Sequence, residues 1–164
     1  MKKKSLPFDK YVTVFLDNLA IHFIKGSIIS CASKWVIIKC VDPFGEYDGI
    51  QFFKKKDILF IESYPVEYMH IEDDDTLPIL KRTCDIHKIL KYISTNKVVT
   101  IEYQKKKSES GIVERKDGIY YIRTVDIQDC TDQTNVSKIP IKKIKRIHVD
   151  SLMGKDAKTI LKIG

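Results

Sequence analysis

Long hydrophobic runs are absent from this 164-residue chain, because a Lys, Asp or His interrupts every apolar stretch after a few residues. A membrane-spanning helix needs about 20 consecutive apolar residues, so none is expected. The basic N-terminus, Met1 to Pro7, has no apolar segment or cleavage site behind it and does not fit a secretion signal. We therefore expect a soluble, cytoplasmic protein.

Cysteine is scarce. The chain has Cys31, Cys40, Cys84 and Cys130, without regular spacing. Disulfide frameworks are typical of short secreted chains, so reduced and mostly buried thiols are expected here. Cys84 and His87 have the spacing of two metal ligands on one helix face, but the sequence offers no second pair to complete a zinc site. We predict no metal and no cofactor.

Catalytic signatures are also missing. The sequence contains no Gly-rich phosphate loop, nucleophile elbow or Ser/His/Asp arrangement. The carboxylates of Glu72 to Asp75 could gather a divalent cation, but a solvated acidic linker explains them more simply. We predict that the protein is not an enzyme.

What the chain does have is a globular composition, with 43% hydrophobic residues, 31% charged residues and a net charge of +7. The charge is uneven: residues 83–164 carry seventeen Lys and Arg against ten Asp and Glu, whereas residues 63–82 carry two against five. The acidic segment also contains Pro65 and Pro78. It is predicted to be a linker over residues 64–82.

The pattern of apolar segments occurs twice, about 85 residues apart, which indicates two copies of one small module. The paired segments are 19–29 with 98–113, 35–42 with 119–126, and 50–61 with 139–149. Modules of roughly 65 to 70 residues are marginally stable alone, so we expect the copies to pack on each other.

A helix is predicted before the strands of each copy. Apolar residues recur at helical spacing after Asp85, a good capping residue, and predict a helix over about 85–95. Comparable spacing from Tyr11 to Leu19 predicts a matching helix in the first copy, although its β-branched residues favour helix less.

The end of the second copy shows a change of hydrophobic period, from two to three and back, between Ile139 and Val149. This change predicts a strand, one helical turn that inserts Ile144 into the mouth of a barrel, and a returning strand. Pro140 cannot donate to a ladder, so its strand is expected at a sheet edge. The predicted core residues are Phe23, Ile28, Trp35, Ile37, Ile101, Ile119, Ile122 and Ile144.

The order of these features resembles a known group. A strand with the single Gly26, a strand ending in Val41-Asp42, a loop from Gly45 to Ile50, and Asp57-Ile58 followed by Ile61 are similar to bacterial tandem-repeat proteins with Sm-like small β-barrels, which are functionally uncharacterised. The resemblance implies a mainly β (α+β) fold of two tandem barrels, each with a short N-terminal helix and about five antiparallel strands. The implied units are 1–63 for the first barrel, 64–82 for the linker, 83–151 for the basic second barrel, and 152–164 for a tail or short helix.

Nucleic-acid binding is one functional hypothesis. Sm-like proteins place a basic pair near the final strand, but Glu62 and Asp150 occupy those places here. Basic side chains beside aromatics in the second copy are still suited to holding a backbone and stacking a base. The candidate nucleic-acid-binding residues are Lys105, Lys106, Lys107, Tyr120, Lys142, Lys143, Lys145 and Arg146.

Protein binding is the favoured hypothesis. A solvated surface also explains the basic residues, no ligand chemistry stands out, and small barrels with unpaired edges suit partner strands. We therefore predict a non-catalytic binding module of the protein-interaction, adaptor or immunity type, with an unidentified protein partner. Single-stranded RNA is the alternative partner. A monomer or homodimer is expected, because Pro140 removes a donor from the strand that would pair with a further copy.

Overall fold

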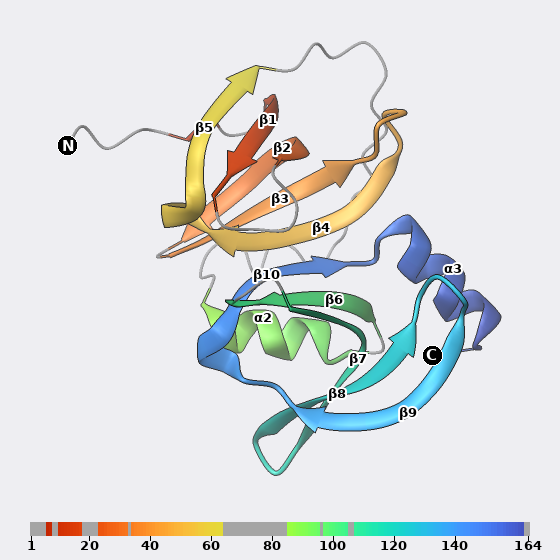
Figure 1. Ribbon diagram of the computed structural model, residues 1–164. Coiled ribbons are helices and arrows are strands. Elements are labelled where there is room, and N and C mark those ends of the chain that lie inside the picture. Colours follow the sequence, from red (N-terminus) through yellow and green to blue (C-terminus); the bar gives the residue numbers. More distant parts are fainter. Residues whose placement is uncertain are drawn as a thin grey trace.

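The computed structural model describes residues 6–7, 10–17, 23–32, 34–63, 85–95, 97–104 and 107–162. This part of the chain is mainly β, and its ten strands form one antiparallel sheet (Figure 1). The first half contributes β1 (Tyr11–Leu16), β2 (Phe23–Ala32), β3 (Trp35–Val41), β4 (Tyr47–Lys54), the one-turn 3₁₀ helix η1 (Lys55–Asp57) and β5 (Ile58–Ser63). The second half contributes α2 (Ile86–Ile93), β6 (Val98–Tyr103), β7 (Ser108–Lys116), β8 (Ile119–Asp126), β9 (Thr131–Lys138), η3 (Ile141–Lys143), β10 (Ile144–Val149) and α3 (Leu152–Ile160).

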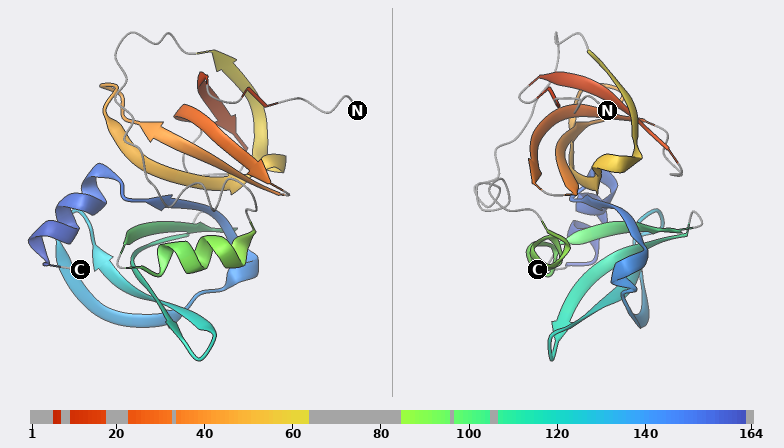
Figure 2. Two further views of the ribbon diagram at one scale, coloured as in Figure 1. Left: turned by 180° about the vertical axis from the view of Figure 1, so that it is seen from behind. Right: turned by 90° about the vertical axis from the view of Figure 1, so that its left-hand side faces the viewer.

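The strand order is the same in the two halves, β5-β1-β2-β3-β4 in one and β10-β6-β7-β8-β9 in the other. The halves join where β4 and β10 pair, with Phe52 opposite Ile147 and Gln51 opposite His148. Each half curves around its own interior, as the views in Figures 1 and 2 show. The last strand of the second half therefore extends the sheet of the first half.

Two glycines lie where neighbouring strands approach closely. A Cβ atom at Gly26 would lie 1.9 Å from the carbonyl oxygen of Lys39, and a Cβ at Gly111 would lie 2.1 Å from that of Arg123. Gly26 is opposite Cys40 in the β2/β3 ladder, and Gly111 is opposite Thr124 in the β7/β8 ladder. Only glycine leaves room for the neighbouring backbone at these positions, and both lie at the same point of their half.

The larger hydrophobic core is shared by the two halves. It combines Ile37 and Phe52 of the first half with Leu90 of α2 and with Ile101 and Ile147 of the second. A smaller core lies within the first half. It contains Val12, Val14, Leu16, Ile24, Ile28, Val36, Ile38, Cys40 and Phe53. The two halves of the described chain therefore pack on each other.

The helix predicted over residues 85–95 is confirmed, because α2 covers Ile86–Ile93 and the Asp85 side chain accepts a hydrogen bond of 2.9 Å from the backbone N–H of Lys88. The helix predicted for Tyr11 to Leu19 is wrong over its described part. Residues 11–16 form β1, which pairs with both β2 and β5. Their β-branched side chains suit a strand between two neighbours, and this tertiary pairing overrides a helical spacing of only two turns.

The helical turn predicted near Ile144 is confirmed by η3, and Ile144 itself is fully buried. Trp35, Ile28, Ile37, Ile101 and Ile122 are also buried as predicted. Phe23 and Ile119 were wrongly placed in the core. They are 51% and 37% exposed because each is the first residue of its strand, where the sheet no longer covers it.

Pro140 lies just outside β9, as the residue before η3, so it removes no donor from that strand. The strand is nevertheless an outer one, as predicted, because β9 stands at the end of the sheet order. The predicted linker over residues 64–82 falls outside the described residues. Neither of the two described α-helices is long and apolar enough to cross a membrane.

Candidate functional site

The predicted nucleic-acid-binding residues do not form one surface. Lys107, Lys142 and Lys143 are exposed, whereas Lys145 is half-buried. Lys105 and Lys106 lie outside the described residues. Tyr120 and Arg146 are buried, so the structure removes both from a set of surface contacts.

Arg146 is buried because it holds strands together. Its Nε donates to Glu102 Oε2 at 3.1 Å, and its Nη1 donates to Gln51 Oε1 at 2.7 Å. Glu102 lies on β6 and Gln51 on β4, the two neighbours of β10. The guanidinium therefore serves the junction of the two halves rather than a ligand.

Tyr120 belongs to the shared core, where only 6% of its surface is exposed. The guanidinium of Arg115 lies 5.7 Å from the centre of its ring. Its neighbour Tyr121 is half-buried, since successive residues of a strand point to opposite faces. The Tyr120 ring is therefore closed to a stacking base.

Lys145 faces the first half of the chain. Its Nζ lies 3.9 Å from Oδ1 of Asp57, the last residue of η1. This contact spans the junction of the halves and separates Lys145 from Lys142 and Lys143, which belong to η3. The basic run in the sequence thus divides into residues with different roles.

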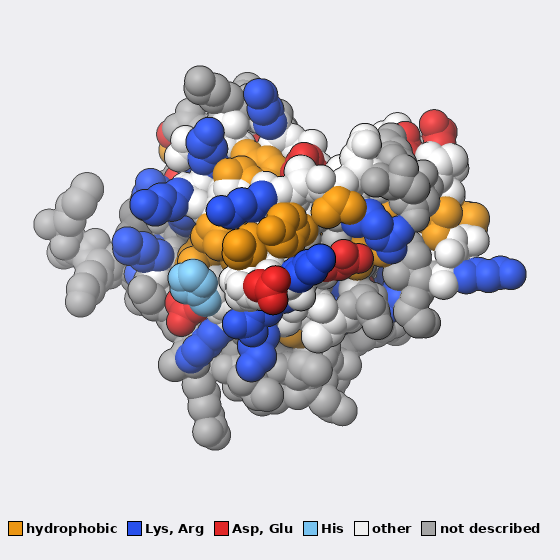
Figure 3. Space-filling model, turned by 90° about the horizontal axis from the view of Figure 1, so that it is seen from below, with side chains coloured by type: hydrophobic (Ala, Val, Ile, Leu, Met, Phe, Trp, Pro, Cys, Tyr) orange, Lys and Arg blue, Asp and Glu red, His pale blue; other side chains and the backbone are white. Residues whose placement is uncertain are grey.

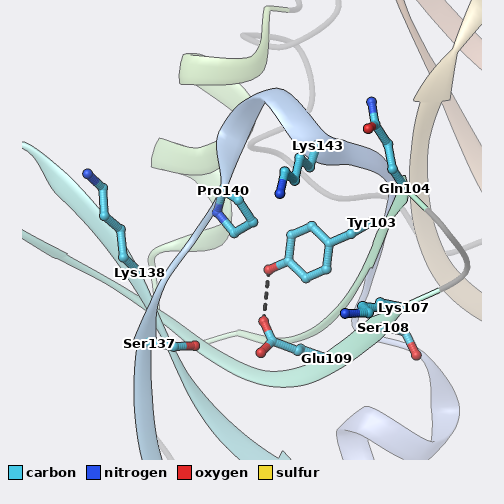
Figure 4. Close-up of a pocket in the computed structure, with 9 residues that line it drawn as sticks. All are labelled: Tyr103, Gln104, Lys107, Ser108, Glu109, Ser137, Lys138, Pro140 and Lys143. Carbon is cyan, nitrogen blue, oxygen red and sulfur yellow. Dashed lines mark hydrogen bonds between the residues drawn. The ribbon is translucent and has the colours of Figure 1, made fainter.

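A hollow of about 740 Å³ gathers other predicted residues. It is lined by Tyr103, Gln104, Lys107, Ser108, Glu109, Ser137, Lys138, Pro140 and Lys143 (Figure 4). These residues come from the end of β6, the start of β7, the end of β9 and the η3 turn. Lys107 and Lys143 are therefore brought together although they are far apart in sequence.

The centre of this hollow is polar. The Tyr103 hydroxyl donates to Glu109 Oε2 at 2.9 Å, which is the bond drawn in Figure 4. Burial and, after it, the negative charge of Glu109 raise the pKa of the Tyr103 phenol, so it stays protonated at neutral pH. Lys138 points away from the Tyr103 ring, while Pro140 and Lys143 lie on its η3 side. The rim offers ammonium groups, and the floor offers one carboxylate.

The lower face of the molecule, seen directly in Figure 3, places hydrophobic side chains among Lys and Arg residues. Ile119 of β8 and Val136 of β9 are the large hydrophobic residues that remain exposed on the last two strands within the described residues. The face is therefore mixed rather than purely basic, in contrast to what the sequence charge suggested.

An aromatic cluster, which the sequence analysis missed, lies at the other end of the sheet. The rings of Phe15 and Phe60 stack with their centres 4.3 Å apart, and Phe23 lies 6.2 Å from Phe15. Leu59 and Phe60, both on the outer strand β5, are 52% and 44% exposed. Assigning residues 11–19 to a helix and Phe23 to the core hid this cluster, because the three rings meet only when β1 pairs with both β2 and β5.

The thiols of Cys31 and Cys40 show no sign of activation as nucleophiles. Cys31, Cys40 and Cys130 are free, and Cys84 lies outside the described residues. Burial raises the pKa of the Cys40 thiol far above its ordinary value, and it also raises that of Cys31 against the opposing effect of Lys55. A raised pKa keeps a thiol in its unreactive protonated form.

No group of three or more potential metal ligands occurs within the described ranges. No protein-family model matches the chain. No curated protein is significantly similar to it in sequence. The two surfaces at the ends of the sheet and the charges around them are therefore the candidates for function.

Proposed function

We propose that this protein is a non-catalytic protein-interaction module, of the adaptor or immunity type, built from two Sm-like small barrels. The aromatic cluster on the outer strand β5 carries this proposal. The shared strand order, the close-approach glycines and the 3₁₀ turn before the last strand of each half support the tandem-barrel interpretation. Free thiols at Cys31, Cys40 and Cys130 fit a reducing compartment, so we place the protein in the cytoplasm.

The outer strand has the features of a docking edge. Among the described strands β5 pairs only with β1, so its other edge offers main-chain donors and acceptors to an added strand. Exposed edges are an aggregation risk that proteins usually reduce with charge, prolines or bulges. This edge carries one exposed charge, Glu62, and a register irregularity opposite Phe15 and Leu16, but it also presents the adjacent apolar side chains Leu59 and Phe60. Because each is already about half covered, burying the rest of one such side chain is worth about 1 kcal/mol.

In the second half, the strand at the equivalent position has both of its edges paired. The strand β10 pairs with β6 on one side and with β4 on the other, and Ile147 and Val149 are fully buried there. Phe60 in β5 and Arg146 in β10 occupy equivalent positions. Each lies two residues after the isoleucine, Ile58 or Ile144, that follows the 3₁₀ turn of its half. We propose that an extended segment of a partner protein pairs with β5 as β4 pairs with β10, and covers Phe60.

Site-specific photo-crosslinking in cells of the organism that makes the protein tests this proposal. A photoreactive phenylalanine analogue replaces Phe60, and a matched control carries it at Phe44, which is 86% exposed in the loop before β4. We expect a crosslinked foreign protein from position 60 and none from position 44. The Phe60→Ser variant should then fail to bind the purified partner, and Phe44→Ser should bind normally. Crosslinks only to a second copy of the chain, or equal crosslinking at both positions, would overturn the proposal.

Single-stranded RNA binding is the second candidate, favoured by the position of Lys107, Lys138 and Lys143 around the 740 Å³ hollow. Ammonium groups on three separate segments suit a phosphate backbone, and such binding weakens steeply with salt. Fluorescence anisotropy with mixed-sequence RNA at about 50 mM salt should then show binding to the native chain and weak binding to the Lys107/Lys138/Lys143→Gln variant. No binding by the native chain would exclude this candidate.

A further inference from the structure

A second hollow, of about 510 Å³, is lined among the described residues by four lysines: Lys34, Lys54, Lys55 and Lys56. It lies at the other half of the chain from the predicted basic patch, where the turn between β2 and β3 meets η1. Lys34, Lys55 and Lys56 are exposed, and Lys54 is half-buried. Because Lys34 is distant in sequence from the other three, charge runs in the sequence did not reveal the group.

The backbone holds these lysines together. The N–H of Lys55 donates to the carbonyl oxygen of Lys34 at 2.8 Å, and Lys54 is opposite Trp35 in the β3/β4 ladder. The Lys54 ammonium group lies 5.6 Å from the centre of the Trp35 ring, which anchors its position. The sheet and η1 therefore hold the backbones of these lysines close together.

The electrostatics indicate an excess of positive charge. Burial lowers the pKa of Lys54, and the neighbouring charges of Lys56, Lys145 and Lys34 lower it further. The carboxylate of Asp57 opposes this effect, but it is also paired with Lys145 at 3.9 Å. Lys54 thus experiences three neighbouring ammonium groups and one carboxylate. A multiply charged anion would relieve their mutual repulsion.

We propose that this hollow binds adjacent phosphate groups of an oligophosphate chain. Flexible ammonium groups bind phosphate as point charges without demanding one geometry. The Trp35 ring beside Lys54 is buried and has no free face for a base, so the contacts are to phosphate rather than to a nucleobase. This site is independent of the strand-binding edge on β5. A free oligophosphate and a nucleic-acid backbone are the two sources of such a ligand.

Isothermal titration with inorganic tripolyphosphate at about 50 mM salt tests the proposal. The test variant is Lys34/Lys55/Lys56→Gln, and the matched control is Lys91/Lys116/Lys162→Gln, which removes the same charge from exposed positions of the second half that line neither hollow. We expect the test variant to bind about tenfold more weakly or worse, and the control to stay within about twofold of the native chain. Equal weakening of both would indicate net charge alone, and no binding by the native chain would also overturn the proposal.

Two additions make the result unambiguous. Thermal unfolding verifies that each variant is folded, and the single variant Lys55→Gln, which should lose about threefold or more in affinity, replaces the triple variant if that one does not fold. Competition with mixed-sequence single-stranded RNA separates the sources of phosphate. Displacement of tripolyphosphate by RNA assigns the hollow to a nucleic-acid backbone, and failure of RNA to displace it assigns the hollow to a free oligophosphate.

Discussion

Arg146 and Glu102 form a buried ion pair between adjacent strands, with Nε 3.1 Å from Oε2 and side chains that are 5% and 1% exposed. The same guanidinium also bonds Gln51 on the other neighbouring strand. Because β10 lies between β4 and β6, one side chain connects the two halves of the sheet. The positive charge of Arg146, which the sequence analysis assigned to nucleic-acid binding, therefore joins the two halves.

Removing one member of this pair should be costly. The variant Arg146→Ala leaves the Glu102 carboxylate buried without its cation, and we expect a loss of about 3 to 5 kcal/mol in the free energy of unfolding. Urea titration measures it. Arg123→Ala is the matched control, since its pair with Glu114 is 3.6 Å long and largely solvent-accessible, and it should cost no more than about 1 kcal/mol. Equal losses in the two variants would contradict the structural role of Arg146.

His148 makes the junction sensitive to acid. Burial lowers the pKa of His148 below its ordinary value of 6.5, and the nearby Arg146 acts in the same direction, against the opposing effects of Asp48 and Asp150. The folded protein therefore holds a neutral ring, while the unfolded chain takes up a proton as the pH falls through 6.5. The free energy of unfolding should therefore keep its full value above pH 6.5 and decrease as the pH falls below it.

Thermal unfolding between pH 5 and 8 should show this loss in the native chain and a flatter profile in His148→Gln. His87→Gln, which alters an exposed histidine of α2, should keep the native profile. A His148→Gln profile as steep as the native one would place the acid sensitivity elsewhere.

Local patterns predicted the second half of the chain well. Asp85 is a strong helix-capping residue, and the change of period around Ile144 has no other simple explanation, so α2 and η3 were both identified. In contrast, residues 11–16 carry a spacing that fits a helix as well as a strand. These residues form a strand because β2 and β5 pair with them on either side. Pairing between strands that are distant in the chain cannot be read from the local pattern of one sequence.

The candidate surfaces were less predictable than the fold. A run of basic residues looks uniform in sequence, but Arg146 points into the junction, Lys145 pairs with Asp57, and Lys143 lines a hollow. The sign of a charge is local information, whereas its burial depends on which strands lie on each side. The aromatic cluster was missed for the same reason, since Phe15 and Phe60 meet only across a strand pair.

Gly111 should not tolerate a side chain. Its added Cβ would lie 2.1 Å from the Arg123 carbonyl oxygen, so Gly111→Ala must push β7 and β8 apart, and we expect a loss of about 2 kcal/mol or more in denaturant titration. Gly118→Ala is the control, since its Cβ would meet nothing within 4 Å and only the positive φ of 77° opposes the change. That variant should cost about 1 to 2 kcal/mol. A smaller loss at Gly111 than at Gly118 would contradict the close approach.

Ile144 should contribute strongly to stability as the residue that follows η3 into the core. It is fully buried, so Ile144→Ala should cost about 2 to 5 kcal/mol in the free energy of unfolding. Ile160→Ala, at an exposed position of α3, should change stability by less than about 0.5 kcal/mol. A cost below about 0.5 kcal/mol at Ile144 would show that its side chain does not support the shared core.

The assembly state follows from a comparison of the two equivalent strands β4 and β9. Repeating the β4/β10 junction between molecules would pair β9 of one chain with β5 of the next. The strand β4 has five consecutive buried residues, Gly49 to Phe53, at its junction, whereas Asn135 to Lys138 of β9 are all exposed and include one large apolar side chain. A strand added to β9 would therefore bury little apolar surface, and extended rings or fibres are disfavoured.

Light scattering should give the mass of one or two chains, and Phe60→Lys should convert any dimer to a monomer if β5 is the edge that pairs. A mass of three or more chains would show that β9 pairs despite its polar surface.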